Sequence, residues 1–345
     1  MKPYEELDRA NRISRMRQLA LAALNAYGLS GARFRFLKQA GNTLFRVNER
    51  TPPNRTREEI YERGQYLLRI HQPGYQTSEA IDLELQWLAA MCRDAHLPVP
   101  EPVPSRDGSL LTQASIPGIP GVFNVSLLRW VKGRQLRKEE FRPHHYRAQG
   151  ILSAQLHQYA EHWRPPAGLV KRNYDWDGLF SEDGGAGIPA REAWSLLPTN
   201  YLAPFRIVTD KVRQVMNELG KGPDVYGLIH ADLGLDANVL FWKGEAHAID
   251  FDDSGTGYYL YDLSLALEHC QEDRELPRLR DSLLEGYTQF RSLPADTIEY
   301  MSIFLAGFCV FLSLWAAASM PSMPDHRKEL HQRMERALRL VKRLI

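Results

Sequence analysis

The chain has 345 residues, 44% hydrophobic and 25% charged, an ordinary globular composition with enough length for two moderate domains. Its formal net charge of +1 gives no overall attraction to nucleic acid, and no nucleic-acid partner is expected. Cys92, Cys270 and Cys309 are far apart, which argues against a disulfide framework or a structural zinc site. With no signal-peptide pattern in the charged first 16 residues, a cytoplasmic location is expected.

The first part of the chain predicts a helix followed by a small antiparallel sheet. In chain order, the expected elements are a helix at 5–27, a hairpin at 32–49 that turns at 39–42, a surface connection at 51–65, a strand at 66–73, a helix at 78–95 with Ser78 as its N-cap, and strands at 97–111 and 121–133. This gives an N-terminal helix within residues 1–29 and a unit of five strands and one helix over residues 30–131.

Helices dominate the remainder, residues 132–345. Helical patterns cover 145–162 and 201–219, short strands are expected near 227–230, 239–242 and 247–251, and four further helical stretches follow.

Two of these later stretches allow a membrane interpretation. Residues 301–320 carry no charge, and this uncharged segment is long enough for a membrane-spanning helix. A buried core helix is the favoured interpretation, so no stable membrane insertion is expected. The last helix, from Arg327, has an apolar stripe among seven Lys or Arg residues, which favours a terminal helix packed by that stripe over one lying on a membrane. The stripe comprises Leu330, Met334, Leu338, Val341 and Ile345.

Polar residues that could bind a metal or take part in catalysis cluster at two places beside apolar runs. The stretch "GLIHADLGLDANVLF" at 227–241 contains His230, Asp232, Asp236 and Asn238, and "AIDFDDSG" contains Asp250, Asp252 and Asp253. Five carboxylates within 22 residues, next to buried strands, are costly unless a cation meets them. The pattern therefore predicts a metal site.

The pair "HADLGLDAN" and "IDFDD" resembles the catalytic and metal loops of the aminoglycoside phosphotransferase family, which is related in fold to choline kinases and protein kinases. The resemblance extends over about residues 30–320. It implies a bilobal α+β, protein-kinase-like fold, with an antiparallel sheet in the N-lobe and a mainly helical C-lobe.

Within that resemblance, Asp232 is the expected catalytic residue, orienting the acceptor hydroxyl, and Asn238 and Asp250 are the expected Mg²⁺ ligands. His230 is expected to support the loop, whereas Asp252 and Asp253 either approach metal or substrate or cap the next turn. The family pattern has four residues between its Asp and Asn, but here there are five. Either the loop bulges at Gly234 and Asn238 still reaches the metal, which is favoured, or Asp236 replaces it.

The first lobe is then expected to hold the nucleotide. The turn at Gly41, Asn42 and Thr43 offers backbone N–H groups to phosphates. Arg69 occupies the strand position where lysine is commoner, with Glu84 as its helix partner; the alternative for Arg69 is a solvent-facing side chain.

By the same resemblance, the backbone of Arg129, Trp130 and Val131 is expected to hydrogen-bond adenine, although Trp130 also suits a core aromatic. Asp262 is expected to brace the catalytic loop by accepting backbone N–H groups. Aromatic residues at 173–180, with Tyr258 and Tyr259, either line an acceptor pocket or pack in the core.

The function implied is an ATP-dependent, Mg²⁺-dependent phosphotransferase acting on a hydroxyl of a small molecule such as an aminoglycoside, an amino alcohol or a sugar, with GTP as the alternative donor. The competing interpretations are a nucleotide-binding pseudokinase, favoured by Arg69 and the longer loop, and a Ser/Thr protein kinase of the same fold. No activation segment ending in "APE" follows the metal loop, which disfavours a protein substrate.

Overall fold

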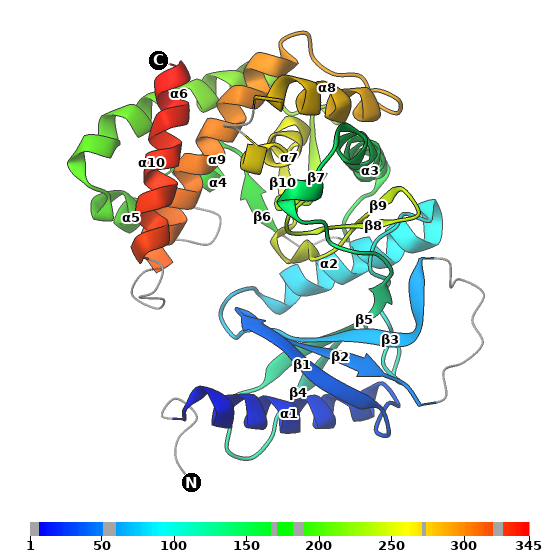
Figure 1. Ribbon diagram of the computed structural model, residues 1–345. Helices are drawn as coiled ribbons and strands as arrows, with labels where there is room; N and C mark the ends of the chain where they lie inside the picture. Colours follow the sequence, from blue (N-terminus) through cyan, green and yellow to red (C-terminus); the bar gives the residue numbers. More distant parts are fainter. Residues whose placement is uncertain are drawn as a thin grey trace.

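The structure is a computed structural model that describes residues 7–50, 60–166, 171–181, 190–270, 274–319 and 327–344. A lobe built on an antiparallel sheet stands below a larger, mainly helical lobe (Figure 1). This confirms the predicted α+β class and the division into a β-rich first part and a helical second part.

The first lobe contains α1 (Arg9–Ala26), β1 (Arg33–Ala40), β2 (Asn42–Asn48), β3 (Tyr61–Ile70), α2 (Ser78–Ala90), β4 (Leu111–Ala114) and β5 (Phe123–Val131). Its strands form one antiparallel sheet in the order β1-β2-β3-β5-β4. The predicted number of five strands agrees, although the fourth strand is β4 and not the predicted strand at 97–111.

The alternation of side chains along these strands explains why α1 and α2 cover opposite faces of the sheet (Figure 1). Phe45, Leu68 and Ile70 belong to the buried apolar cluster that also includes Leu19 and other residues of α1. Arg69 lies between Leu68 and Ile70 in sequence, so it faces the other way, toward α2 and the helical lobe. Because side chains alternate along the strand, the Arg69 guanidinium lies at the interface between the lobes.

Several predicted boundaries in the first lobe are wrong. The N-cap of α2 is Thr77, whose hydroxyl accepts from the Ala80 N–H at 3.2 Å, and α2 ends in a π-helical turn, Met91–Ala95. Strand β3 begins at Tyr61, within the predicted surface connection, whose residues 51–59 lie outside the described part. The predicted strand at 97–111 is mostly irregular, with only its last residue in β4.

The second lobe contains α3 (Pro143–His162), β6 (Arg172–Tyr174), α4 (Trp176–Phe180), α5 (Ala190–Leu196), α6 (Thr199–Leu219), β7 (Tyr226–Ile229), β8 (Val239–Trp242), β9 (Glu245–Ala248), β10 (Gly255–Tyr258), α7 (Tyr259–Leu265), α8 (Leu276–Tyr287), α9 (Thr297–Ser319) and α10 (Arg327–Leu344). The last of the three predicted short strands corresponds to β9, which ends at Ala248, three residues before the predicted end, because the chain turns into the acidic loop there.

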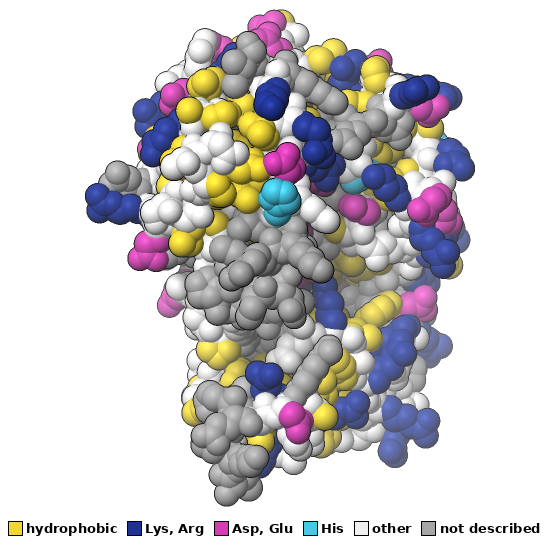
Figure 2. All heavy atoms as spheres, turned by 60° about the vertical axis from the view of Figure 1, so that its left-hand side comes forward, with side chains coloured by type: hydrophobic (Ala, Val, Ile, Leu, Met, Phe, Trp, Pro, Cys, Tyr) yellow, Lys and Arg dark blue, Asp and Glu magenta, His cyan; other side chains and the backbone are white. Residues whose placement is uncertain are grey.

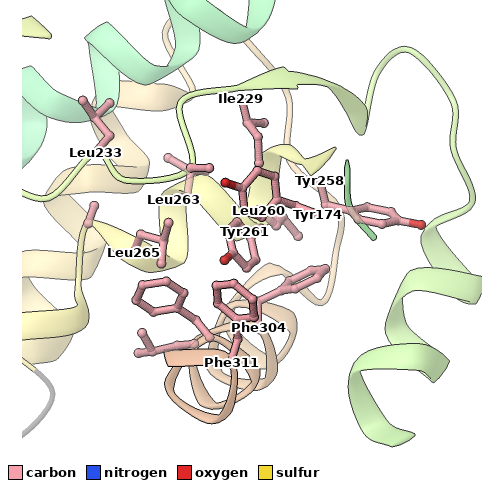
Figure 3. Close-up of a cluster of buried hydrophobic side chains, with 14 of the residues drawn as sticks. Tyr174, Ile229, Leu233, Tyr258, Leu260, Tyr261, Leu263, Leu265, Phe304 and Phe311 are labelled. Carbon is pink, nitrogen blue, oxygen red and sulfur yellow. The ribbon is translucent and has the colours of Figure 1, made fainter. Parts of the chain in front are cut away.

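The apolar helix α9 packs against α5, α6, α7 and α10. It is the one helix in the described ranges long and apolar enough to cross a membrane, but 72% of its most apolar window is buried inside the protein. The favoured core interpretation agrees with that burial. Figure 3 shows Phe304 and Phe311 of α9 beneath Tyr261 and Leu265 of α7.

Helix α10 packs on α9 and α6. Met334 and Val341 of its predicted apolar stripe are buried and Leu338 is half-buried, as expected for a packed terminal helix. Ile345 and the side chain of Leu330 lie outside the described part. Figure 2, which brings forward the side carrying α10, shows Lys and Arg side chains interspersed with hydrophobic ones over the helical lobe.

Candidate active site

The loop that carries Asp232 leaves the end of β7 in a strained but well-supported turn. Ala231 has a φ of +64°, a conformation that non-glycine residues rarely adopt. The buried carboxylate of Asp262 accepts from the N–H groups of His230 and Ala231 at 2.9 and 2.7 Å, and it contacts His157 at 3.1 Å. The predicted bracing role of Asp262 is confirmed.

The His230 side chain links the two loops. Its Nε2 lies 3.0 Å from the carbonyl oxygen of Ile249, and its Nδ1 lies 3.3 Å from the N–H of Asp232. Burial lowers the pKa of His230, which favours the neutral ring. This geometry agrees with the expected supporting role.

Asp232 and Asn238 are adjacent despite the extra residue between them. The amide Nδ2 of Asn238 donates to Asp232 Oδ2 at 2.8 Å and to the Asp232 carbonyl at 2.9 Å. The carbonyl of Gly234 accepts from the N–H groups of Ala237 and Asn238, so the added residue is taken up in a helical turn. The turn that takes up the added residue thus begins at Gly234, as favoured, but Gly234 has no positive φ; the unusual φ belongs to Ala231.

The environment of Asp232 favours a protonated carboxyl. Burial, followed by repulsion from Asp253 and Asp250, raises its pKa to about 7. A cation bound between these carboxylates would oppose that rise. Asp236 is half-exposed, with its carboxylate 3.9 Å from His269.

Asp250 follows β9 with a φ of +63°, and Arg69 reaches it from the first lobe. Arg69 is only 2% exposed, so the solvent-facing alternative is wrong. Its Nη1 is 2.8 Å from Glu84 Oε1, and its Nη2 is 3.2 Å from Asp250 Oδ1. Glu84 is thus the partner of Arg69, as expected.

A second buried cation, Lys171, comes from the helical lobe to the same place. Its Nζ lies 3.8 Å from Glu84 Oε2 and donates to Ser254 Oγ at 2.5 Å. The two cations thus share the carboxylate of Glu84 across the interface between the lobes. The sequence analysis missed Lys171, since its position depends on the parallel pairing of β6 with β10, for which the sequence carries no local signal.

The last two acids of the metal loop are held by other protein groups. Asp252 accepts from Asn42 Nδ2 at 2.9 Å and from Gln76 Nε2 at 3.0 Å, and Asp253 accepts from the Tyr75 hydroxyl at 2.8 Å and from Arg172. Neither side chain caps the next turn, so that alternative is wrong. Burial raises the pKa of Asp252 to about 6.

The hairpin expected to contact phosphate touches this acidic loop. Gly41 is the turn residue between β1 and β2, with a φ of +71° that glycine adopts without strain. The side chain of Asn42 is engaged by Asp252 and by the N–H of Gln72, and Thr43 is buried. The phosphate-binding role of Gly41, Asn42 and Thr43 stays a prediction.

The segment expected to contact adenine, residues 129–131, forms the last part of β5. The N–H of Arg129 donates to the carbonyl of Glu101 at 2.9 Å, and its side chain pairs with Glu101. The side chain of Trp130 is half-buried under Arg46 rather than inside the core. The Arg129 N–H is thus engaged within the protein, and the adenine contact predicted for the backbone of Arg129, Trp130 and Val131 stays a prediction.

The described residues contain no cluster of three or more His, Cys, Asp or Glu side chains arranged to hold a metal ion. The five carboxylates expected to share a cation therefore do not form one cluster. Asp252 and Asp253 accept from protein groups, Asp250 contacts Arg69, Asp232 accepts from Asn238, and Asp236 lies near His269. A site with few protein ligands suits a cation that keeps waters and phosphate oxygens as its other ligands, as Mg²⁺ usually does.

A cavity of about 790 Å³ opens beside Asp232. Its lining includes Arg172, Tyr174 and Tyr261, together with residues of α9 and α10. Of the aromatic residues proposed for an acceptor pocket, Tyr174 lies on this cavity, whereas Tyr258 and Tyr259 are buried in the core. The carboxylate of Asp232 thus has space for a drug-sized molecule next to it.

Comparison with known proteins gives consistent matches over most of the chain. Residues 51–297 match the model of the phosphotransferase enzyme family. An amicoumacin kinase of Bacillus subtilis is 25% identical over 295 residues, 84% of this chain and 75% of that protein. A microcompartment-associated aminopropanol kinase superposes with a TM-score of 0.74 at 26% identity, covering 94% of this chain and 95% of that one.

Another solved structure supports the fold alone. The amicoumacin kinase hAmiN, in complex with AMP-PNP, Ca²⁺ and Ami, gives a TM-score of 0.72 at 20% identity and covers 96% of both chains.

Proposed function

Because this chain belongs to the phosphotransferase enzyme family and is a kinase with an alcohol group as acceptor, we propose that it moves the γ-phosphoryl group of ATP to a hydroxyl of a small molecule, with Mg²⁺. The observation that carries the proposal is the contact between Asp232 and Asn238 at the wall of a large cavity, where the charge of Asp250 helps to raise the pKa of Asp232.

In the proposed reaction, Asp232 orients the acceptor hydroxyl and receives its proton. The hydroxyl oxygen forms a bond to the γ-phosphorus, the bond to the β,γ-bridging oxygen breaks, and ADP leaves with that electron pair. Burial and the neighbouring acids keep the carboxyl of Asp232 basic enough for this transfer.

Asn238 and Asp250 are the residues proposed to hold the cation. The Nδ2 of Asn238 is engaged by Asp232, which leaves its Oδ1, a hard neutral oxygen, for a metal. Asp250 is 36% exposed and supplies an anionic oxygen. The cation would neutralise charge on the transferred phosphoryl group.

The proposed acceptor is a small hydroxylated molecule. The names of the two relatives, an amicoumacin kinase and an aminopropanol kinase, support that class. ATP is the proposed donor because one structural neighbour holds an ATP analogue, and GTP stays the alternative.

The test is ADP release with Mg²⁺ across amino alcohols, aminoglycosides, sugars and hydroxy acids, with native protein and the Asp232→Asn variant. We expect acceptor-dependent release that falls by about 10²-fold or more in the variant, as for loss of a general base. The exposed Asp281 supplies a matched control, Asp281→Asn, expected to retain activity. Unchanged release by Asp232→Asn, or turnover that persists in EDTA, would refute the assignment.

A further inference from the structure

The cavity beside Asp232 is much larger than the reacting group of an acceptor. With a volume of about 790 Å³, it extends from the catalytic loop to residues of α9 and α10. Helix α9 stands between α7 and α10 and contacts both (Figure 1). A small amino alcohol would leave most of this volume empty, so the side chains on the wall indicate what the rest of the acceptor is.

Part of the cavity wall is apolar. It is formed by Phe308, Phe311 and Leu312 of α9 and by Leu265 of α7. Figure 3 shows Leu265 facing the aromatic side chains of α9. Leu312 is only half-buried, so part of its side chain is open to a ligand. Because covering apolar surface is favourable in water, an acceptor that fills this part of the cavity has an apolar body.

A buried hydroxyl in the same cavity indicates that a polar ligand atom binds there too. Tyr261 of α7 lines the cavity and is 1% exposed, yet its hydroxyl has no hydrogen-bond partner among the described residues. Its ring is held by edge contacts with Phe304 and Phe308. A buried hydroxyl without a partner is unfavourable, and a ligand oxygen or nitrogen would satisfy it.

The Tyr261 side chain also lies within electrostatic range of the catalytic carboxylate. Burial, followed by the influence of Tyr174, Asp262 and Asp232, raises the pKa of Tyr261 well above its ordinary value. Tyr261 therefore stays a neutral hydroxyl that can donate to a ligand or accept from it. A molecule that reaches Asp232 with one hydroxyl can reach Tyr261 with another polar atom.

Building on the proposed function, we propose that Tyr261 is an acceptor-binding residue and that the acceptor is a hydroxy compound with an apolar body and a second polar atom. The reacting hydroxyl lies at Asp232, and the second polar atom bonds to the Tyr261 hydroxyl. The apolar body covers Phe308, Phe311 and Leu312. The apolar wall sets the preference for the body, and the Tyr261 hydrogen bond fixes how the acceptor is turned toward Asp232.

The first experiment measures binding without turnover. Isothermal titration with native protein and a non-hydrolysable ATP analogue compares phenylalkane-1,2-diols of increasing chain length, the two phenylalkanols that each keep one of the hydroxyls, and glycerol. We expect the best phenyl diol to bind at least about tenfold more tightly than glycerol, because it buries a phenyl group. It should also bind at least about threefold more tightly than either of its phenylalkanols, because they lack one hydrogen bond.

A pair of tyrosine variants then tests the hydrogen bond. In Tyr261→Phe the advantage of the diol over the phenylalkanols should fall to near onefold, and the melting temperature should stay the same or rise, because the lost hydroxyl has no protein partner. Tyr258→Phe is the matched control, since Tyr258 is buried outside the cavity lining and its hydroxyl donates to the Met216 carbonyl at 2.9 Å. That variant should lower the melting temperature and keep the advantage of the diol.

A second pair of variants tests the apolar wall. Leu312→Asn should reduce the advantage of the phenyl diol over glycerol by about threefold or more, because it places an amide where the phenyl group is expected. Ile298→Asn makes the same kind of change at an exposed position of α9 outside the cavity, and it should leave the advantage unchanged.

Three results would overturn the proposal. These are binding of glycerol as tight as that of every phenyl diol, an advantage of the diol that survives in Tyr261→Phe, and no binding of any phenyl diol at millimolar concentration. Binding that depends on Tyr261 without ADP release from any probe would support the acceptor site and count against the proposed reaction. ADP release confined to glycerol and other wholly polar acceptors would support the reaction and refute the apolar site.

Discussion

Arg69 is a single buried cation that forms ion pairs with three carboxylates. Besides the contacts with Glu84 and Asp250, its Nη1 lies 3.7 Å from Asp252. A lysine ammonium is one point charge, whereas the guanidinium fork presents separate N–H groups to separate acids. This geometry gives a physical reason for arginine at a strand position where lysine is commoner: the residue joins α2 of the first lobe to the metal loop of the second.

We expect Arg69 and Glu84 to be strongly coupled in stability. Arg69→Met should lower the free energy of unfolding by about 3–5 kcal/mol, because it leaves Glu84 buried with only Lys171 nearby. Arg69→Met/Glu84→Leu should cost at least about 1 kcal/mol less than the sum of the single changes. Urea unfolding of the four proteins measures this cycle.

A matched surface pair provides the control for that cycle. Arg147 and Glu285 lie 2.9 Å apart but are 46% and 64% exposed. Their coupling should be about 1 kcal/mol or less. If the buried pair couples no more strongly than this surface pair, the interpretation of Arg69 as the link between the lobes is wrong.

At the level of single residues, the sequence identified those that belong to a local pattern. Glu84 was predictable from its helix, and Asp262 from its place at the head of α7. Tyr261 was not, because nothing local distinguishes a buried tyrosine with an unpaired hydroxyl from the core tyrosines beside it. The engagement of Asn42 by Asp252 joins residues 210 positions apart, which no local pattern encodes.

At the level of elements, helices were predicted better than the segment at 97–111. That segment has prolines at 98, 100, 102 and 104, which lack the N–H groups that a ladder requires. It runs beside β5 through an isolated bridge between Pro102 and Leu128 instead of forming a strand. The alternation of apolar residues there reflects the burial of an irregular segment. Because a strand would show the same period of two, the sequence pattern does not distinguish between them.

The packing of α3 against α8 is the clearest case in which one element determines the place of another. Gly150 of α3 and Gly286 of α8 allow the backbones to touch: an added Cβ would lie 2.0 Å from the Leu283 carbonyl oxygen and 2.0 Å from the Arg147 carbonyl oxygen, respectively. Since α3 also contributes His157, which contacts Asp262, this close approach supports the brace of the catalytic loop.

We therefore expect Gly150→Ala and Gly286→Ala to destabilise the protein. Alanine gains about 1 kcal/mol in helix propensity, but backbone atoms cannot move aside cheaply, and overpacking costs about 1–3 kcal/mol or more. Thermal and urea unfolding measure the balance. Gly31→Ala, where a Cβ meets no atom within 4 Å, should be nearly neutral; a gain in stability at Gly150 or Gly286 would mean that the helices are not in backbone contact.

At the scale of the whole molecule, the resemblance of two short loops led to the correct two-lobed arrangement, but not to the way in which the lobes meet. Polar side chains of the first lobe reach the acidic loop directly, with Gln76 bonded to Asp252 and Tyr75 to Asp253. Burying so many polar groups in and around one interface makes the folded state sensitive to their protonation.

Buried histidines should make the protein labile to mild acid. Burial, assisted by Arg69 and Lys171, lowers the pKa of His71 well below its ordinary value, and burial also lowers the pKa of His157 despite the nearby Asp262. Below about pH 6.5 these histidines take up protons in the unfolded chain but not in the folded chain, so their contribution to stability is full above that pH and declines below it. Each such histidine contributes up to about 1.4 kcal/mol per pH unit in that range.

Asp232 and Asp252, with pKa values raised to about 7 and about 6, take up protons in the folded state over the same range and oppose this loss. The prediction is therefore a difference between two proteins: from pH 7.5 to pH 5.5, the change in melting temperature should be less unfavourable in His71→Gln than in the native protein. Glutamine cannot titrate, and its amide can still bond to Ser126, which lies 3.0 Å from His71 Nε2. His162→Gln, at an exposed position, supplies the control for loss of a histidine that is not buried. Because the carboxylate of Asp262 also titrates, its depressed pKa adds to the loss only at lower pH. An identical pH profile in His71→Gln and the native protein would mean that His71 becomes protonated without unfolding, so that the contacts around Arg69 would have to open to admit its charge.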